Sequence, residues 1–238
     1  MSRRPDAGAR TVTVMDLRTS TRPRRHRSVV PVLVVAVLIV LAGCTPTTTT
    51  ATLAAADDAA EPAPGWNGAA VEGAPRVPAA VLTDTDGRPY DLRAHMAQRP
   101  TLVYFGYTHC PDVCPVHMAT IAAALGESAV RTEQLNVVFV TVDPARDTPE
   151  VLDGFLASFD PSFVGLTAPR DEIDDVVTGL GLPAPVLEGD PDTPTYTMGH
   201  PSQVFAFDTD GRARIAYPFG TRQSQWVEDL PRLVREWS

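Results

Sequence analysis

The sequence predicts one α/β domain in which helices pack on a mixed sheet, and three observations lead to this prediction. Two continuous runs of β-branched and aromatic residues, 101–107 and 135–143, are typical of strands that are buried on both faces. Each run is followed by a segment whose apolar residues have helical spacing. Two Asp-Gly pairs, at 86–87 and 210–211, lie between apolar runs and predict β-hairpins.

The elements can be expected in the following order. A hairpin over 79–95 precedes the strand 101–107, and Pro111 and Asp112 then suit the start of a helix that continues to Leu125. After the strand 135–143, a helix over 147–159 is predicted to begin with Asp147 as its cap and a proline in its first turn. A strand over 162–168, a helix over 171–181, a hairpin over 202–220 and a closing helix over 224–236 complete the domain.

This order of strand, helix, strand, helix, antiparallel hairpin and helix is that of a thioredoxin-like α/β sandwich with an added N-terminal hairpin. Residues 182–200 fit no element and form a connection longer than is usual, so this long loop before the late hairpin is expected to be either functional or mobile.

The N-terminal region has the features of an export signal. A basic stretch at 22–27 precedes an apolar stretch at 28–44 that ends in Leu-Ala-Gly-Cys. The ending resembles the lipobox of bacterial lipoproteins, which implies acylation of Cys44 and a location on the outer face of the cytoplasmic membrane. An uncleaved transmembrane anchor is the alternative, and both place the domain outside the cytoplasm.

The chain therefore divides into three parts. Residues 1–43 form a lipoprotein-type signal peptide, and residues 44–74, rich in Thr, Ala and Pro, form a disordered tether. Residues 75–238 form the thioredoxin-like domain. Residues 44–238 contain 12 basic and 27 acidic side chains, a net charge of −15, which argues against a nucleic-acid partner. The chain has no lysine, which excludes Schiff-base and P-loop chemistry.

The cysteines give the most specific signal. If Cys44 carries lipid, only Cys110 and Cys114 remain, at the junction between a buried strand and a helix. A helix N-terminus favours thiolates, and side chains four residues apart share one helical face, so both sulfurs can bind one metal ion or form a disulfide. Two thiolates without a second cysteine pair suggest a soft ion, with copper the leading candidate and a third ligand supplied from elsewhere.

Three sequence blocks carry a family resemblance. The segments YFGYTHCPDVCP (104–115), VTVDPARDTPEVL (140–152) and MGHPSQVFAFDTDGRARIAYPFG (198–220) together resemble the Sco/SenC family of thioredoxin-fold copper chaperones. The resemblance implies copper binding through Cys110, Cys114 and His200. Family members often have Asp before the histidine and no proline after it, whereas this chain has Gly199 and Pro201 there.

The same resemblance implies delivery of copper, as Cu(I) or Cu(II), to the binuclear copper site of cytochrome c oxidase, or reduction of the thiols of that site. The implied partners are the copper-receiving oxidase subunit and, beyond it, other copper chaperones or thiol oxidoreductases. We expect a metallochaperone rather than a turnover enzyme; if it is an enzyme, it is a thiol–disulfide oxidoreductase with Cys110 and Cys114 as catalytic residues that form a redox disulfide. A peroxidase and a purely structural disulfide are further alternatives.

Other polar and sulfur-containing side chains have structural and functional interpretations. His109 is either a solvated turn residue or a group that tunes the thiolate pKa. His117 and Met118 can face the cysteine site but more often pack in a helix, and Met198 is either loop packing or a soft accessory ligand. Asp143, Arg146 and Asp147 form either an acid–base group or, as we favour, a turn, an ion pair and the cap of the following helix. Asp112 is interpreted as a partner of the helix dipole and His95 as a structural residue.

Overall fold

The computed structural model describes residues 61–238. Its strands are β1 (Ala69–Ala70), β2 (Val81–Asp84), β3 (Pro89–Asp91), β4 (Thr101–Gly106), β5 (Asn136–Thr141), β6 (Val164–Thr167), β7 (Val186–Glu188), β8 (Thr197–Gly199), β9 (Val204–Phe207) and β10 (Ala213–Tyr217). Its helices are α1 (Leu92–Met96), α2 (Val113–Glu127), α3 (Pro149–Ala157), α4 (Arg170–Gly179) and α5 (Gln223–Trp237).

A mixed sheet forms the middle layer of the domain. Its strand order is β1-β10-β9-β4-β5-β6-β2-β3, with β4, β5 and β6 parallel and β9 antiparallel to β4. All six residues of β4 are buried, as are five of the six in β5, because helices cover both faces of these central strands. The prediction of two strands buried on both faces is confirmed.

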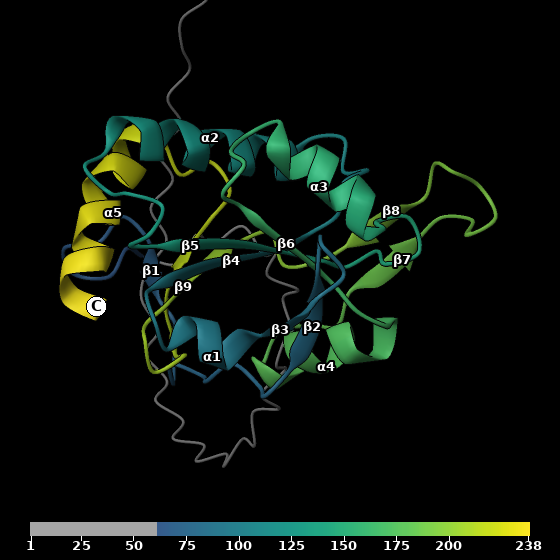
Figure 1. Ribbon diagram of the computed structural model, residues 1–238, viewed down its shortest axis with the longest axis horizontal. Coiled ribbons are helices and arrows are strands. Elements are labelled where there is room, and N and C mark those ends of the chain that lie inside the picture. Colours follow the sequence, from purple (N-terminus) through teal and green to yellow (C-terminus); the bar gives the residue numbers. More distant parts are fainter. Residues whose placement is uncertain (1–60) are drawn as a thin grey trace, which may run out of the picture. The chain divides into compact units, whose positions relative to one another are not determined.

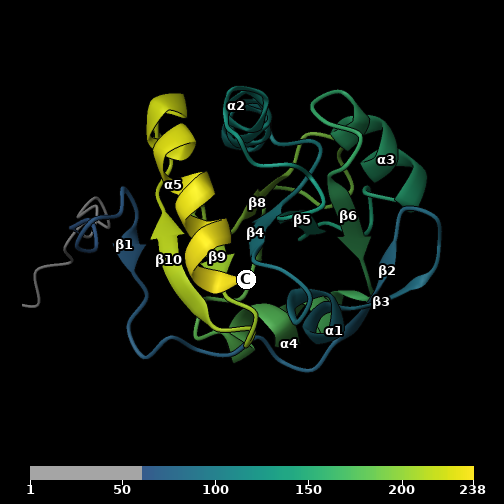
Figure 2. The same ribbon diagram turned by 60° about the vertical axis from the view of Figure 1, so that its left-hand side comes forward.

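The helices lie in two outer layers. Helices α2, α3 and α5 cover one face of the sheet, and α1 and α4 cover the other (Figures 1 and 2). The thioredoxin-like sandwich, its N-terminal hairpin and its late hairpin are therefore all present. The N-terminal hairpin joins the main sheet, because β2 pairs with both β3 and β6.

The glycine at the end of β4 shows how tightly the centre of the domain is packed. A Cβ atom at Gly106 would lie 2.7 Å from Cε1 of Tyr104 and 3.0 Å from the ring of Phe139. No larger residue fits without displacing these two buried rings. The glycine of the YFGYT sequence thus serves packing, directly before the loop that carries the first cysteine.

Three predictions about elements need correction. Residues 61–74 were assigned to the disordered tether, yet β1 pairs with β10 and Asn67 bonds to Asp229 on α5, so the domain includes them. The segment 92–96 is a short helix rather than part of a hairpin, since Asp91 caps it by accepting from the Ala94 N–H. The segment 182–200 contains a two-stranded sheet, β7 with β8, where no element was expected.

The cap of α3 also differs from the prediction. Thr148, not Asp147, caps this helix, and its side chain accepts from the Val151 N–H. The predicted signal peptide, the lipidation at Cys44 and most of the predicted tether lie outside the described residues. Within residues 61–238, no helix has the length and apolar character needed to cross a membrane.

Candidate metal centre

The two motif cysteines lie where β4 gives way to α2. The chain leaves the sheet at Gly106, passes Cys110 in the connecting loop and enters the helix at Val113. Cys110 is half-buried and Cys114, in the first turn, is fully buried, and both are free thiols. The Cys114 N–H donates to Cys110 Sγ at 3.4 Å, so the helix N-terminus directs one of its unpaired donors at this sulfur.

The third member of the cluster comes from a distant part of the chain. His200 follows β8 directly, and its Nε2 lies 3.8 Å from Cys114 Sγ. Its Nδ1 lies 2.9 Å from the Pro201 carbonyl, which can only accept, so Nδ1 donates and Nε2 is the ring nitrogen that faces the sulfur. A hydrogen bond of this kind at the far ring nitrogen orients metal-binding histidines in general.

The cluster has the dimensions of a metal site. The two sulfurs and the imidazole nitrogen all lie within 4.8 Å of one another. With metal–sulfur bonds of about 2.3 Å and metal–nitrogen bonds of about 2.0 Å, a small inward shift of one side chain brings all three atoms onto one ion. The structure thus brings together the three residues that the sequence predicted as ligands.

The two thiols have opposite acidities. A hydrogen bond from the Cys114 thiol, aided by His200 and by the backbone N–H groups of Asp112 and Cys114, lowers the pKa of Cys110 to about 3 although partial burial opposes the shift. The same contact between the sulfurs, together with burial, raises the pKa of Cys114. Cys110 is therefore a thiolate at neutral pH, and Cys114 holds the proton until a metal ion or a partner displaces it.

Two tyrosines form the walls of the cluster. Tyr104, on β4, is buried and donates its hydroxyl hydrogen bond to Cys114 Sγ at 3.4 Å. The rings of Tyr104 and Tyr107 meet the His200 imidazole edge to face, with centroids 6.0 and 5.7 Å away. These rings confine the imidazole to one orientation and shield the buried sulfur from water.

His117 supports the site without joining the cluster. This buried histidine donates from Nε2 to the Ser202 carbonyl at 2.9 Å and packs against the ring of Tyr104. Burial lowers the pKa of His117, so the ring is neutral at pH 7. Its bond to Ser202 connects α2 to the segment that carries His200, which agrees with the predicted packing role.

Asp147 fixes the loop in front of the first cysteine. This carboxylate is completely buried and accepts from the Thr108 N–H at 3.0 Å, the Thr108 hydroxyl at 2.6 Å and the Thr141 hydroxyl at 2.6 Å. Three hydrogen bonds satisfy the buried charge. The acid that the sequence assigned to a helix cap therefore tethers the Cys110 loop to the end of β5.

Asp143 and Arg146 hold the segment that leads to His200. The predicted ion pair between them is confirmed, with Arg146 Nε 2.5 Å from Asp143 Oδ2. Arg146 also donates to the carbonyls of Pro194 and Tyr196, and its guanidinium lies 3.5 Å from the centroid of the Tyr196 ring. The Tyr196 hydroxyl donates to Asp143 Oδ1 at 2.8 Å. We call Asp143, Arg146 and Tyr196 the latch.

The remaining candidates have structural positions. His109 is half-exposed, and its Nδ1 lies 3.0 Å from the Thr108 hydroxyl oxygen. Met118 and Met198 are buried in the core, and Asp112 precedes α2 without a side-chain capping bond. His95 stacks on Tyr90 with ring centroids 3.7 Å apart. The structural interpretation of His95 and Met118 is confirmed.

Sequence reasoning missed the hydroxyl groups around the site: Tyr104, Tyr107, Thr108, Thr141 and Tyr196. A signal existed for part of this set, because Thr108 and Thr141 stand at the carboxyl ends of neighbouring parallel strands, where polar side chains converge. No comparable signal marks Tyr196, whose place depends on how the 182–200 segment folds back.

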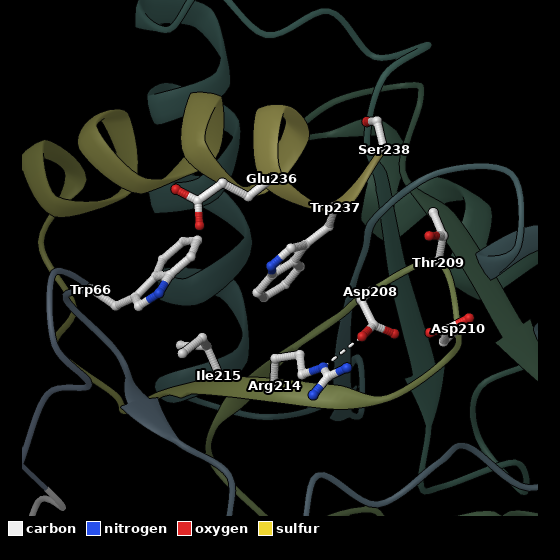
Figure 3. A pocket seen from close by; sticks show the side chains of 9 residues that line it. All are labelled: Trp66, Asp208, Thr209, Asp210, Arg214, Ile215, Glu236, Trp237 and Ser238. Atoms are coloured by element: carbon white, nitrogen blue, oxygen red, sulfur yellow. Dashed lines mark hydrogen bonds and ion pairs between the residues drawn. The ribbon is translucent and has the colours of Figure 1, made fainter.

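Figure 3 shows a second cavity, whose lining shares no residue with this cluster. It has a volume of about 460 Å³ and is lined by Trp66, Asp208, Thr209, Asp210, Arg214, Ile215, Glu236, Trp237 and Ser238. Arg214 pairs with Asp208 and Arg232 pairs with Glu236, so these two lining carboxylates are neutralised within the domain. The cavity contains none of the predicted site residues.

The fold and the cluster define a class: a thioredoxin-like protein with a metal-type Cys-Cys-His site at the carboxyl end of its parallel strands. A family model described as SCO1/SenC matches residues 73–235. The chain belongs to the SCO1/SenC family.

Known members of the family show the extent of the similarity. Protein SenC of Rhodobacter capsulatus is 40% identical over 110 residues, covering 46% of this chain and 49% of SenC. The mitochondrial SCO1 homolog of Homo sapiens is 34% identical over 139 residues, covering 52% of this chain and 45% of that protein. Each match thus spans about half the length of the relative.

A solved structure gives a similar picture of the fold. The structure of Bradyrhizobium japonicum ScoI with copper bound is 32% identical, with a TM-score of 0.59; the similarity covers 66% of this chain and 99% of ScoI.

Proposed function

We propose that this protein binds one copper ion through Cys110, Cys114 and His200 and delivers it to the binuclear copper site of cytochrome c oxidase. The observation that carries the proposal is the convergence of two sulfurs and one imidazole nitrogen within 4.8 Å. Thiolates favour soft ions, and a set of three donors suits copper better than the four that structural zinc requires. The copper bound to the related ScoI structure supports the choice of metal.

The arrangement of the ligands suits a carrier that releases its cargo. Cys110 and Cys114 lie on one rigid junction between β4 and α2, whereas His200 comes from the segment after β8. The latch and the His117 bond to Ser202 hold that segment in place. A change in those contacts would withdraw His200 and leave copper on the two sulfurs. The half-exposed Cys110 sulfur would then be accessible to an acceptor.

The proposal includes a location. A basic stretch, an apolar stretch and the Leu-Ala-Gly-Cys sequence support export and a lipid anchor at Cys44. Acylation would hold the domain at the outer face of the cytoplasmic membrane. Radiolabelled palmitate incorporated into the chain and lost in Cys44→Ala would support this location; equal labelling of the two would contradict it.

Copper transfer to an acceptor tests the function. The copper-loaded full-length chain in mild detergent is mixed with the reduced, metal-free copper domain of the oxidase subunit encoded by the same organism. We expect copper to leave the chain and the acceptor to gain the absorption bands of a binuclear copper site. Copper that stays on the chain in the presence of a competent acceptor would contradict delivery.

A second function, thiol–disulfide exchange, is favoured by the unequal acidities of the two cysteines. The Cys110 thiolate would attack one sulfur of a partner disulfide, forming a mixed disulfide and releasing a partner thiolate that takes up a proton. Cys114 would lose its proton and attack Cys110 Sγ, releasing the second partner thiol. Two electrons thereby pass from the pair to the partner. Reduction of the oxidised acceptor domain by the reduced, copper-free chain would demonstrate this activity.

A further inference from the structure

A groove is lined by His200 and by parts of the segment that the sequence left unassigned. It has a volume of about 470 Å³ and is lined by Leu182, Pro183, Ala184, Val186, Glu188, Gly199, His200, Pro201, Ser202 and Gln203. The groove therefore adjoins the proposed copper site, because one of its lining residues is a proposed ligand.

The strand beside the groove is an open edge. Among the described residues β7 pairs only with β8, and the connection between these two strands projects from the body of the domain (Figure 1). Val186 is 58% exposed and Leu187 is 37% exposed, so consecutive apolar side chains face outward on both sides of a three-residue strand. Proteins normally protect such an edge, and an exposed apolar edge is a place where an extended partner segment adds as another strand.

At the groove and in the loop that follows β7, the charged side chains without an ion-pair partner among residues 61–238 are acidic. Glu188 lines it, and a Cβ atom at Gly199 would lie 3.0 Å from Glu188 Oε1, so this carboxylate lies against the strand that leads to His200. Within residues 61–238 Glu188, Asp190 and Asp192 make no ion pair. Arg170 binds the Pro185 carbonyl next to β7, but its charge is paired with Asp174.

We propose that β7 and this groove dock an extended segment with basic and apolar side chains, supplied by the protein that receives the copper. The inference rests on the proposed function, since it assigns the partner surface of the same site. The segment would pair with the open edge of β7, cover Val186, and place a cationic side chain at Glu188. Docking there brings the acceptor against His200, the ligand whose departure exposes the copper.

Stopped-flow copper transfer tests the docking surface. The full-length, copper-loaded chain is mixed with the metal-free oxidase copper domain, and the second-order rate constant is measured for Glu188→Arg and Val186→Asp. The matched controls are Glu133→Arg, an exposed charge reversal outside the groove, and Val81→Asp on β2, whose valine is 57% exposed. We expect the groove variants to transfer at least about tenfold more slowly and the controls to match the wild type.

The dependence of the transfer rate on ionic strength and the amide hydrogen exchange of β7 complete the test. The wild-type rate should fall as ionic strength rises, and Glu188→Arg should lose most of that dependence. Amide exchange of residues 186–188 should slow when the metal-free acceptor is added, whether or not copper is transferred. If the acceptor protects the β7 amides but the wild type transfers no copper, the docking inference stands and only the proposed copper delivery is contradicted.

Three results would overturn the inference. The first is groove variants that transfer copper as fast as their controls. The second is β7 amides that stay unprotected at saturating acceptor. The third is protection of β7 in the chain alone at high concentration, which would assign the edge to a second copy of this protein.

Discussion

His200 Nε2 lies 3.8 Å from Cys114 Sγ, although 86 residues separate them in the chain. Metal binding through three ligands depends on this contact, because the two cysteines alone give only a dithiol. The contact is maintained by groups outside the cluster: the Pro201 carbonyl orients the ring, His117 holds Ser202, and the latch holds the preceding segment.

Cys110 should react as a thiolate over an unusually wide pH range. Its pKa of about 3 lies below any working pH, so the rate of alkylation by iodoacetamide should change by less than about twofold between pH 5 and pH 8. An ordinary thiol, with a pKa of about 8.5, would lose about tenfold in rate for each unit below that value. Mass spectrometry of the reduced, metal-free Cys44→Ala chain identifies the modified residue.

A control variant tests the cause of this acidity. Removing the Cys114 thiol removes the largest contribution, so in Cys114→Ala the pKa of Cys110 should rise and its alkylation should become pH-dependent. A wild-type rate that climbs steeply from pH 5 to pH 8 would show that Cys110 has an ordinary pKa.

Asp147→Ala should destabilise the domain by about 2 to 4 kcal/mol. The change removes the acceptor of three hydrogen bonds, so the buried Thr141 hydroxyl loses the acceptor for its proton and the Thr108 N–H loses its partner. The midpoint of urea unfolding measures the loss, and Asp153→Ala, at an exposed position on α3, is the matched control, expected within about 0.5 kcal/mol of the wild type. Equal midpoints for both variants would show that Asp147 does not secure the Cys110 loop.

Much of this arrangement could be predicted from residues alone, for reasons that can be stated. The strands β4 and β5 were identified because burial on both faces leaves a continuous apolar run. The closeness of Cys110 and Cys114 was expected, but the reason given, one shared helical face, was wrong: Cys110 lies in the loop before α2, and its sulfur accepts from the Cys114 N–H in the first turn. His200 could not be placed by periodicity and came only from the family resemblance, since its position depends on a contact across 86 residues.

The strands and hydrogen-bond partners that the sequence did not predict depend on contacts with other segments of the chain. Strands β1 and β7 have two and three residues, too few for alternation to show, and they form because a partner strand is already present. Asp147 resembled a helix cap in sequence because the cap is the next residue, Thr148. Its true partners, Thr108 and Thr141, are brought to it by the parallel pairing of β4 with β5.

Tyr196→Phe should loosen the segment that carries His200 while leaving the copper ligands unchanged. The variant loses the 2.8 Å hydrogen bond to Asp143, about 1 to 1.5 kcal/mol, so amide exchange across residues 190–199 should quicken by about five- to tenfold. Copper should also dissociate faster. As a control, Tyr90→Phe, on β3, should leave amide exchange in residues 190–199 unaltered. Unaltered exchange in Tyr196→Phe would contradict the role assigned to the latch.

Copper retention is the most direct test of the site formed by Cys110, Cys114 and His200. Reduced full-length chain in a Cys44→Ala background is titrated with Cu(I) against a competing chelator, alongside His200→Ala, Cys114→Ala and His95→Ala, a histidine stacked on Tyr90 and outside the cluster. We expect one copper per chain in the wild type and in His95→Ala, and an affinity lower by at least about 100-fold in the other two. His200→Ala should still reduce disulfides. A copper affinity in His200→Ala equal to that of the wild type would contradict the three-ligand site.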